Sequence, residues 1–118
     1  MVEPVRDPQA LQAQLDDFQN MQRQLQMLSM QRQQVNLQME EMKMAQEELG
    51  KATGKIYKAA GNLLIETTAA VAKKELAERI ETFEVRATAL GKQEEKARAR
   101  SEEMRAALEK MVGRPEGA

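Results

Sequence analysis

The sequence predicts a mainly α protein in which two long helices form an antiparallel coiled coil and are joined by a short β-hairpin. Heptad patterns of apolar residues occupy about forty residues on each side of a short middle segment. Gly61-Asn62 lies at the centre of that segment, where a two-residue hairpin turn fits. We expect one domain at 1–118, with helices at about 8–49 and about 69–112, the β-hairpin at about 55–67 and a disordered tail at 113–118.

The first helix is predicted to begin at Asp7-Pro8 and to end near Leu49. Aspartate can accept a hydrogen bond from a free backbone N–H as an N-cap, and proline suits the first helical position. Gly50 follows at once, and glycine is the usual C-cap residue. Nine of the twelve seam positions of this helix are apolar. The a positions are Leu11, Phe18, Leu25, Arg32, Met39 and Gln46, and the d positions are Gln14, Met21, Leu28, Val35, Met42 and Leu49.

The middle segment is predicted to form two short strands, because apolar residues flank a glycine that suits a type II′ turn. A lone two-stranded hairpin is marginal in water, and its unpaired edges are open to other chains. We therefore expect several chains to pool their hairpins into one sheet or a β-barrel body that holds the coiled coils out as arms. The residues expected to form this assembly are Ile56, Tyr57, Gly61, Leu63, Leu64 and Ile65.

The second helix carries a thinner seam than the first. Its d positions are all apolar, whereas only three of its six a positions are apolar. Gly91 lies inside this helix, where glycine costs about 1 kcal/mol relative to alanine. The d positions are Leu76, Phe83, Leu90, Ala97, Met104 and Met111, and the a positions are Lys73, Ile80, Ala87, Glu94, Ser101 and Leu108.

Antiparallel helices of this length bring the start of the first helix to the end of the second. We expect the coil to fray there and to expose apolar side chains, which can hold other polypeptides by burying area. Flexible methionine suits such a surface. The alternative is that these are ordinary seam residues that cover one another. The candidate client-binding residues at these tips are Leu11, Leu15, Phe18, Met104, Leu108 and Met111.

A second group of apolar residues lies outside the seam of the first helix. Met30, Leu37 and Met44 recur every seven residues at f positions and predict an exposed stripe. The stripe can pack against a neighbouring subunit, line a cavity between the arms, or be scatter that the surface tolerates.

Composition excludes most enzyme classes. The chain has no cysteine and no histidine, so thiolate and imidazole chemistry, disulfides and the commonest metal ligands are absent. Gly50 to Lys55 does not match a phosphate-binding loop, because only three residues separate its glycines. A net charge of -1, with interspersed signs, predicts no nucleic-acid partner, and no run of apolar residues predicts a membrane span or a signal peptide. We expect a cytoplasmic protein that is not an enzyme and binds no cofactor or metal.

Several blocks resemble the β subunits of archaeal prefoldin. The segment from Tyr57 to Ile65 has the pattern Tyr-Lys-x-x-Gly-x-Leu-Leu, and Leu90 to Glu95 reads Leu-Gly-Lys-Gln-Glu-Glu. The Gln-rich first helix, with its Met30 to Val35 block, is similar to the same family. The resemblance covers roughly Leu11 to Leu108.

The resemblance implies a hetero-hexamer of two α and four β subunits, with a double β-barrel body and six coiled-coil tentacles. It implies a molecular chaperone that works as an ATP-independent holdase, which captures unfolded proteins at the tentacle tips and delivers them to a group II chaperonin. The partners would be a prefoldin α subunit and further copies of this chain. The alternative function is that of a structural coiled-coil adaptor with one defined protein partner and no general client binding.

Overall fold

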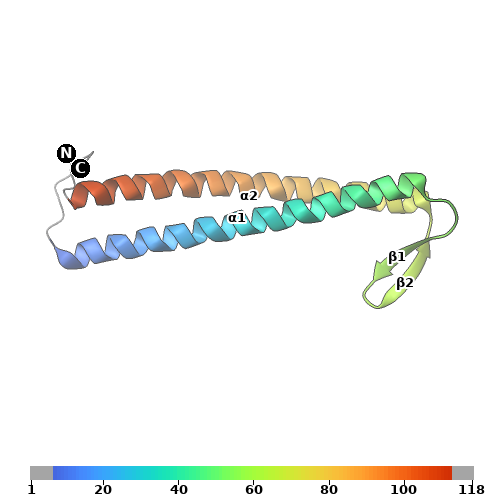
Figure 1. Cartoon of the computed structure of the whole chain (residues 1–118), viewed down its shortest axis with the longest axis horizontal. Coiled ribbons are helices and arrows are strands. Elements are labelled where there is room, and N and C mark those ends of the chain that lie inside the picture. Colours follow the sequence, from blue (N-terminus) through green and yellow to red (C-terminus); the bar gives the residue numbers. More distant parts are fainter. Residues whose placement is uncertain (1–6, 113–118) are drawn as a thin grey trace. The chain divides into compact units, whose positions relative to one another are not determined.

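The computed structural model describes residues 7–112 and contains two long helices and one β-hairpin, as the sequence predicts (Figure 1). The order is α1 (Pro8–Lys51), β1 (Ile56–Ala60), β2 (Leu63–Thr67) and α2 (Ala69–Met111). The tail predicted at 113–118 lies outside the described residues.

The start of α1 has the predicted cap. The backbone N–H of Gln9 donates to Asp7 Oδ1 at 3.0 Å, and the N–H of Leu11 donates to the Asp7 carbonyl at 3.1 Å. Pro8 is the first helical residue, where its missing N–H removes no helical hydrogen bond. The bond to Asp7 Oδ1 satisfies a backbone donor that the first turn leaves without a helical partner, and the bond to the Asp7 carbonyl is the first of the helix itself.

The end of α1 lies two residues beyond the predicted position, at Lys51 rather than near Leu49. Gly50 stays within the helix, and the left-handed conformation is taken by Gly54, with a φ of 87°. The N–H of Ala52 donates to the Leu49 carbonyl at 3.4 Å and closes the last turn. A glycine can end a helix but does not have to, because the helical conformation is also open to it.

The hairpin has the predicted two-residue turn at Gly61-Asn62. Its strands are antiparallel, with Ala60 opposite Leu63 at the turn and Ile56 opposite Thr67 at the base. Gly61 has a φ of 61°, and no non-glycine residue in the described range has a positive φ, so the left-handed conformation is confined to the first central position. That is the pattern of a type II′ turn.

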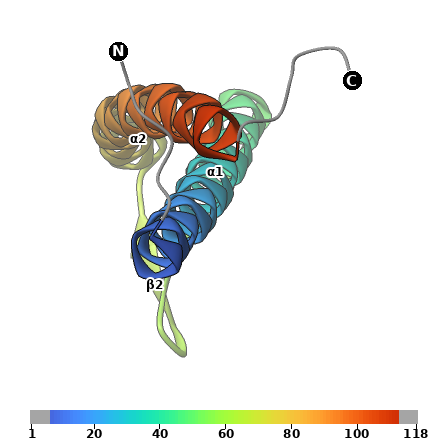
Figure 2. The ribbon, with the colours of Figure 1, turned by 90° about the vertical axis from the view of Figure 1, so that its left-hand side faces the viewer.

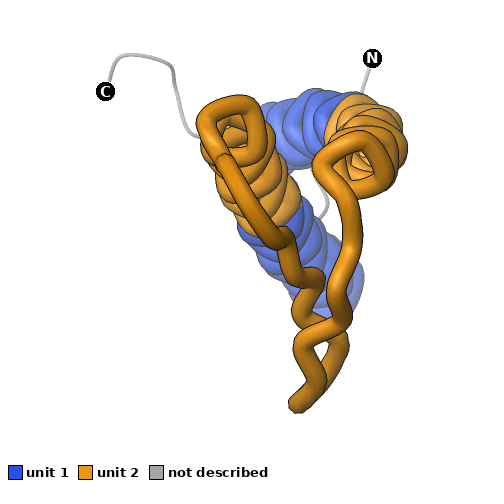
Figure 3. The backbone as a smooth tube through the Cα atoms, turned by 90° about the vertical axis from the view of Figure 1, so that its right-hand side faces the viewer, with its two compact units in different colours: residues 1–31, 90–118 blue, residues 32–89 orange. Residues whose placement is uncertain are grey.

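The described chain forms two compact units (Figure 3). Unit 1 combines the beginning of α1, up to Gln31, with the part of α2 that starts at Leu90. Unit 2 comprises residues 32–89 and contains the rest of both helices and the hairpin. Each unit has its own small core, with Ala97 and Leu108 buried in unit 1 and Val35 and Ile80 buried in unit 2.

The burial of side chains follows the predicted heptads. On α1, every predicted a and d position is half-buried or buried. On α2 the same holds except at Lys73, which is exposed, while the neighbouring Ala72 is half-buried. The prediction for Lys73 was wrong because a lysine near the start of a helix can keep its ammonium group in water while the small Ala72 takes the inner position.

The polar a positions on α2 belong to the interior of unit 1. Glu94 and Ser101 are only 4% and 5% exposed. The Glu94 carboxylate accepts a hydrogen bond from Arg98 Nη2 at 3.2 Å, one turn further along the helix. The core of unit 1 therefore combines small, polar and apolar side chains, which bury less apolar area than an all-apolar seam.

We predict that Gly91→Ala stabilises the protein by about 1 kcal/mol, because alanine is the better helix former. A Cβ at Gly91 would meet no atom within 4 Å, and Gly91 does not have a positive φ. Urea unfolding followed by circular dichroism measures the change.

Gly54→Ala is the matched control for that substitution. Its Cβ would also meet nothing within 4 Å, but the φ of 87° is strained for any side chain. We expect this variant to be less stable than the parent. Equal effects of the two substitutions would contradict the account.

Candidate functional site

The hairpin exposes most of its apolar side chains. Leu64 is 73% exposed and Leu63 is 68% exposed, and Tyr57 and Ile65 are also exposed. Successive side chains of a strand point to opposite faces. The register therefore places Leu63 and Ile65 on one face and Tyr57 and Leu64 on the other. Each face of this small sheet therefore carries exposed apolar side chains.

The hairpin contacts the helices of unit 2 at its base and through β1. Ile56 and Thr67, which pair at the base, are the two strand residues that are half-buried. Lys58 Nζ lies 3.0 Å from Glu75 Oε2 and connects β1 to α2. A groove of about 710 Å³ lies between the hairpin and the adjoining parts of both helices, with Leu49, Tyr57 and Leu76 among its lining residues. The hairpin therefore extends away from the helices of unit 2 (Figure 3).

The structure brings the predicted tip residues together in unit 1. Leu11, Leu15 and Phe18 come from the first turns of α1, and Met104, Leu108 and Met111 come from the last turns of α2 (Figure 2). All six are half-buried or buried, as expected of seam residues.

The end of α2 has an exposed apolar residue that the sequence pattern did not predict. Val112 is exposed directly after the last seam residue, Met111. The heptad pattern stops at Met111, so the only indication that Val112 is exposed was its position after the last repeat.

The stripe at f positions of α1 is exposed. Met30, Leu37 and Met44 all leave more than half of their surface open, and so does Met27, which the heptad pattern did not single out. Val85, at an f position of α2, is 68% exposed. Within the described chain nothing covers these side chains.

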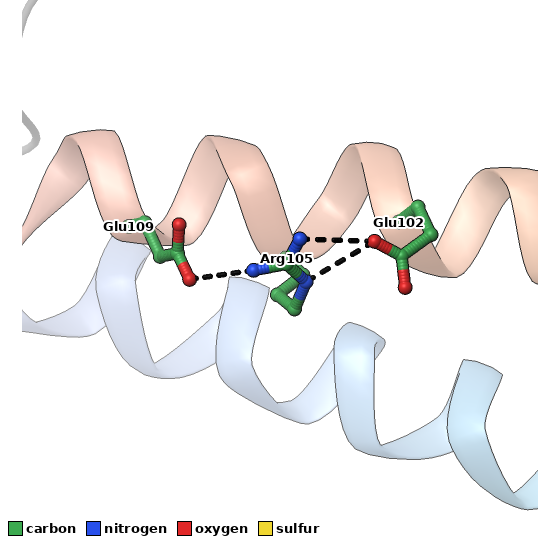
Figure 4. A network of polar contacts seen from close by, with 3 residues as sticks. All are labelled: Glu102, Arg105 and Glu109. Atoms are coloured by element: carbon green, nitrogen blue, oxygen red, sulfur yellow. Dashed lines mark hydrogen bonds and ion pairs between the residues drawn. The ribbon is translucent and has the colours of Figure 1, made fainter. Parts of the chain in front are cut away.

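A charged network lies on the outer surface of α2 near its end (Figure 4). Arg105 donates from Nε and Nη2 to Glu102 Oε2 at 3.2 and 3.0 Å, and from Nη1 to Glu109 Oε1 at 2.7 Å. The hydrogen bonds that Arg105 donates to Glu102 and the charges of both carboxylates raise the pKa of Arg105. These pairs lie three and four residues apart and belong to a solvated helix face.

Between residues 7 and 112, no group of three or more acidic side chains is arranged to hold a metal ion. No helix in that range is long and apolar enough to span a membrane.

The geometry defines a class of protein: a subunit with two long heptad helices and a connecting hairpin that is open to other chains. Comparison with known proteins identifies the family within this class. The profile of the family described as "Prefoldin subunit" matches residues 12–114. The chain therefore belongs to the prefoldin family.

Two relatives agree with this family. The crystal structure of the prefoldin β subunit from Thermococcus strain KS-1 is 36% identical, with a TM-score of 0.81, and the match covers 96% of this chain and 99% of that one. Prefoldin subunit beta from Methanococcus maripaludis is 42% identical over 51 residues, which are 43% of this chain and 45% of that protein. The resemblance to archaeal prefoldin β subunits is thus confirmed. Prefoldin subunits form a non-enzymatic chaperone family.

We predict that Lys58→Glu loosens the hairpin, because it places two carboxylates where an ion pair now connects β1 to α2. Both side chains are about half exposed, so the pair contributes only about 0.2–1 kcal/mol. Hydrogen exchange of the hairpin amides should therefore accelerate modestly. The double variant Lys58→Glu/Glu75→Lys restores opposite charges and should return exchange to the parent rate. Hydrogen exchange at the parent rate in the single variant would show that the ion pair does not hold the hairpin.

Proposed function

We propose that this chain is the β-type subunit of a cytoplasmic prefoldin complex that holds unfolded proteins without ATP and passes them to a group II chaperonin. The observation that carries the proposal is the hairpin, whose two faces are apolar and exposed in a chain of the prefoldin family. Such a surface is too apolar and too open at its edges to remain without partners.

Assembly is the role we assign to the hairpin. Each hairpin offers unpaired backbone groups along both edges, and pairing with neighbouring hairpins would satisfy them. Tyr57, Leu63, Leu64 and Ile65 would then be buried between strands or against helices of other subunits. Resemblance to the family supports four copies of this chain with two copies of a related α subunit.

Client capture is the role we assign to the start of α1 and the end of α2. The six tip residues are apolar and lie near the start of α1 or the end of α2, where local opening has a low free-energy cost. Separation of the two ends would expose these side chains to an unfolded chain. The polar positions Gln14 and Ser101 in the same unit reduce the apolar area that holds the ends together.

An adaptor function is favoured by one observation. The six tip residues are half-buried or buried, as expected of residues that only hold a coiled coil together. An adaptor would use the hairpin and the exposed stripe of α1 to bind one defined partner. Suppression of aggregation separates the two functions, because a holdase protects several unrelated denatured proteins at near-stoichiometric ratio and an adaptor does not.

We expect Leu64→Glu to prevent assembly, because it places a charge on an apolar face that assembly would bury. Size-exclusion chromatography with light scattering should show the mass falling towards that of the free chain. Val85→Glu is the matched control, since Val85 is 68% exposed and Leu64 is 73% exposed. The control should leave the mass unchanged. A Leu64→Glu complex of full mass would argue against assembly through the hairpin.

The same measurement tests the stripe. If Leu37 packs against a neighbouring subunit, Leu37→Glu should lower both the assembled mass and the thermal stability of the complex. An unchanged mass and an unchanged melting temperature would contradict packing against a neighbouring subunit. The stripe would then either line a cavity between the arms or consist of exposed residues that the surface tolerates.

Removal of the tips should separate assembly from client capture. A complex whose chains are truncated to residues 21–100 keeps the hairpin and most of the seam but lacks all six tip residues. We expect it to assemble at full subunit number and to lose suppression of aggregation of denatured proteins. Continued protection by the truncated complex would contradict client capture at the tips.

A further inference from the structure

A small hollow lies between the two helices of unit 1. It is bordered by Gln14 and Asp17 of α1 and by Met104, Ala107 and Leu108 of α2, and its volume is about 230 Å³. The seam is incompletely filled there because a polar residue, Gln14, occupies a d position and a small residue, Ala107, borders it. Met104 can adjust its shape to an occupant, because methionine is flexible.

The hollow has an acidic rim. From Pro8 to Gln22, α1 carries Asp16 and Asp17 and no lysine or arginine. The Asp16 carboxylate already accepts a hydrogen bond from Gln12 Nε2 at 3.1 Å. In the described part of the chain, no hydrogen bond or ion pair engages the carboxylate of Asp17, which is exposed.

Two of the cations near the hollow have local partners, whereas Lys110, two residues after Leu108, is exposed. The Arg105 guanidinium, three residues before Leu108, donates to Glu102 and Glu109 (Figure 4). Arg23, the first cation of α1 after Pro8, donates to Asn20 at 3.2 Å. Because no described cation is bonded to Asp17, its negative charge is available to a ligand that enters the hollow.

We propose that this hollow accepts one apolar side chain of an unfolded polypeptide and that Asp17 favours segments in which a lysine or arginine adjoins that side chain. The inference rests on the proposed function and names the class of client segment that the tips select. The size supports a side chain as the occupant, because pockets for drug-sized ligands measure roughly 300–1,000 Å³. The apolar walls of Met104, Ala107 and Leu108 match an aliphatic group, and the acidic rim matches a neighbouring cation.

The expected selectivity is modest and sensitive to salt. An exposed pair of opposite charges changes an affinity by about two- to fivefold. Salt screens charges separated by more than about 10 Å at 0.1 M ionic strength. The preference for basic segments should therefore shrink as salt is added, while the apolar contribution persists.

The test uses the purified complex that contains the full-length chain and two fluorescent peptides. Both peptides are unstructured and carry one leucine, flanked by lysines in one peptide and by glutamates in the other. Fluorescence anisotropy measures both dissociation constants at low and at high salt. We expect the lysine peptide to bind about two- to fivefold more tightly at low salt.

Two substitutions locate the preference. Asp17→Asn should reduce the ratio of the two dissociation constants towards one, whereas Asp16→Asn, which alters the neighbouring carboxylate, should change it less. Ala107→Leu fills the hollow and should weaken both peptides to a similar extent. Circular dichroism checks that each variant keeps the helical content of the parent.

The outcomes separate the inference from the proposed function. If Asp17→Asn keeps the full preference, or if Ala107→Leu leaves both affinities unchanged, the inference is wrong while the holdase function stands. A change in the mass of the complex on Ala107→Leu would assign the hollow to a contact between subunits and also overturn the inference. If the parent complex binds neither peptide and suppresses no aggregation, the proposed function fails as well.

Discussion

The unpaired hairpin is the constraint on which the rest of this protein depends. Two strands of five residues leave backbone groups free along both edges and expose apolar side chains on both faces. These side chains stay exposed although the base of the hairpin and the Lys58–Glu75 pair hold it to the helices of unit 2. A surface of this kind is stable only when other chains complete it, which fits a subunit of the prefoldin family.

The two units contain parts of the same two helices but bury different kinds of side chains. Unit 2 buries Val35 and Ile80 and carries the hairpin, so it joins the coiled coil to the surface that needs partners. Unit 1 buries Glu94 and Ser101 beside Ala97 and Leu108, and its seam near the helix ends contains Gln14. A seam with small and polar members buries less apolar area. Helix ends held in this way can separate at lower cost, which the proposed capture of an unfolded chain would require.

The sequence predicted the elements well because each is specified by local pattern. The heptads placed all of the α1 seam and all but Lys73 of the α2 seam, and Gly61 placed the turn. The end of α1 was less well specified, because Gly50 is compatible with both a helix and a C-cap. Exposure of Met27 and Val112 was not predicted, since neither belongs to a repeating set. The small hollow beside Asp17 could not be predicted, because it depends on how side chains from distant parts of the sequence fill a seam.

The most direct test of the central claim, that the hairpin requires other chains, is native mass spectrometry of this chain purified from its own cells with its bound partners. The account predicts a stable complex with four copies of this chain and two copies of a second, related coiled-coil chain. A monomer that stays soluble at micromolar concentration would contradict the claim, because the apolar hairpin would then be stable without partners.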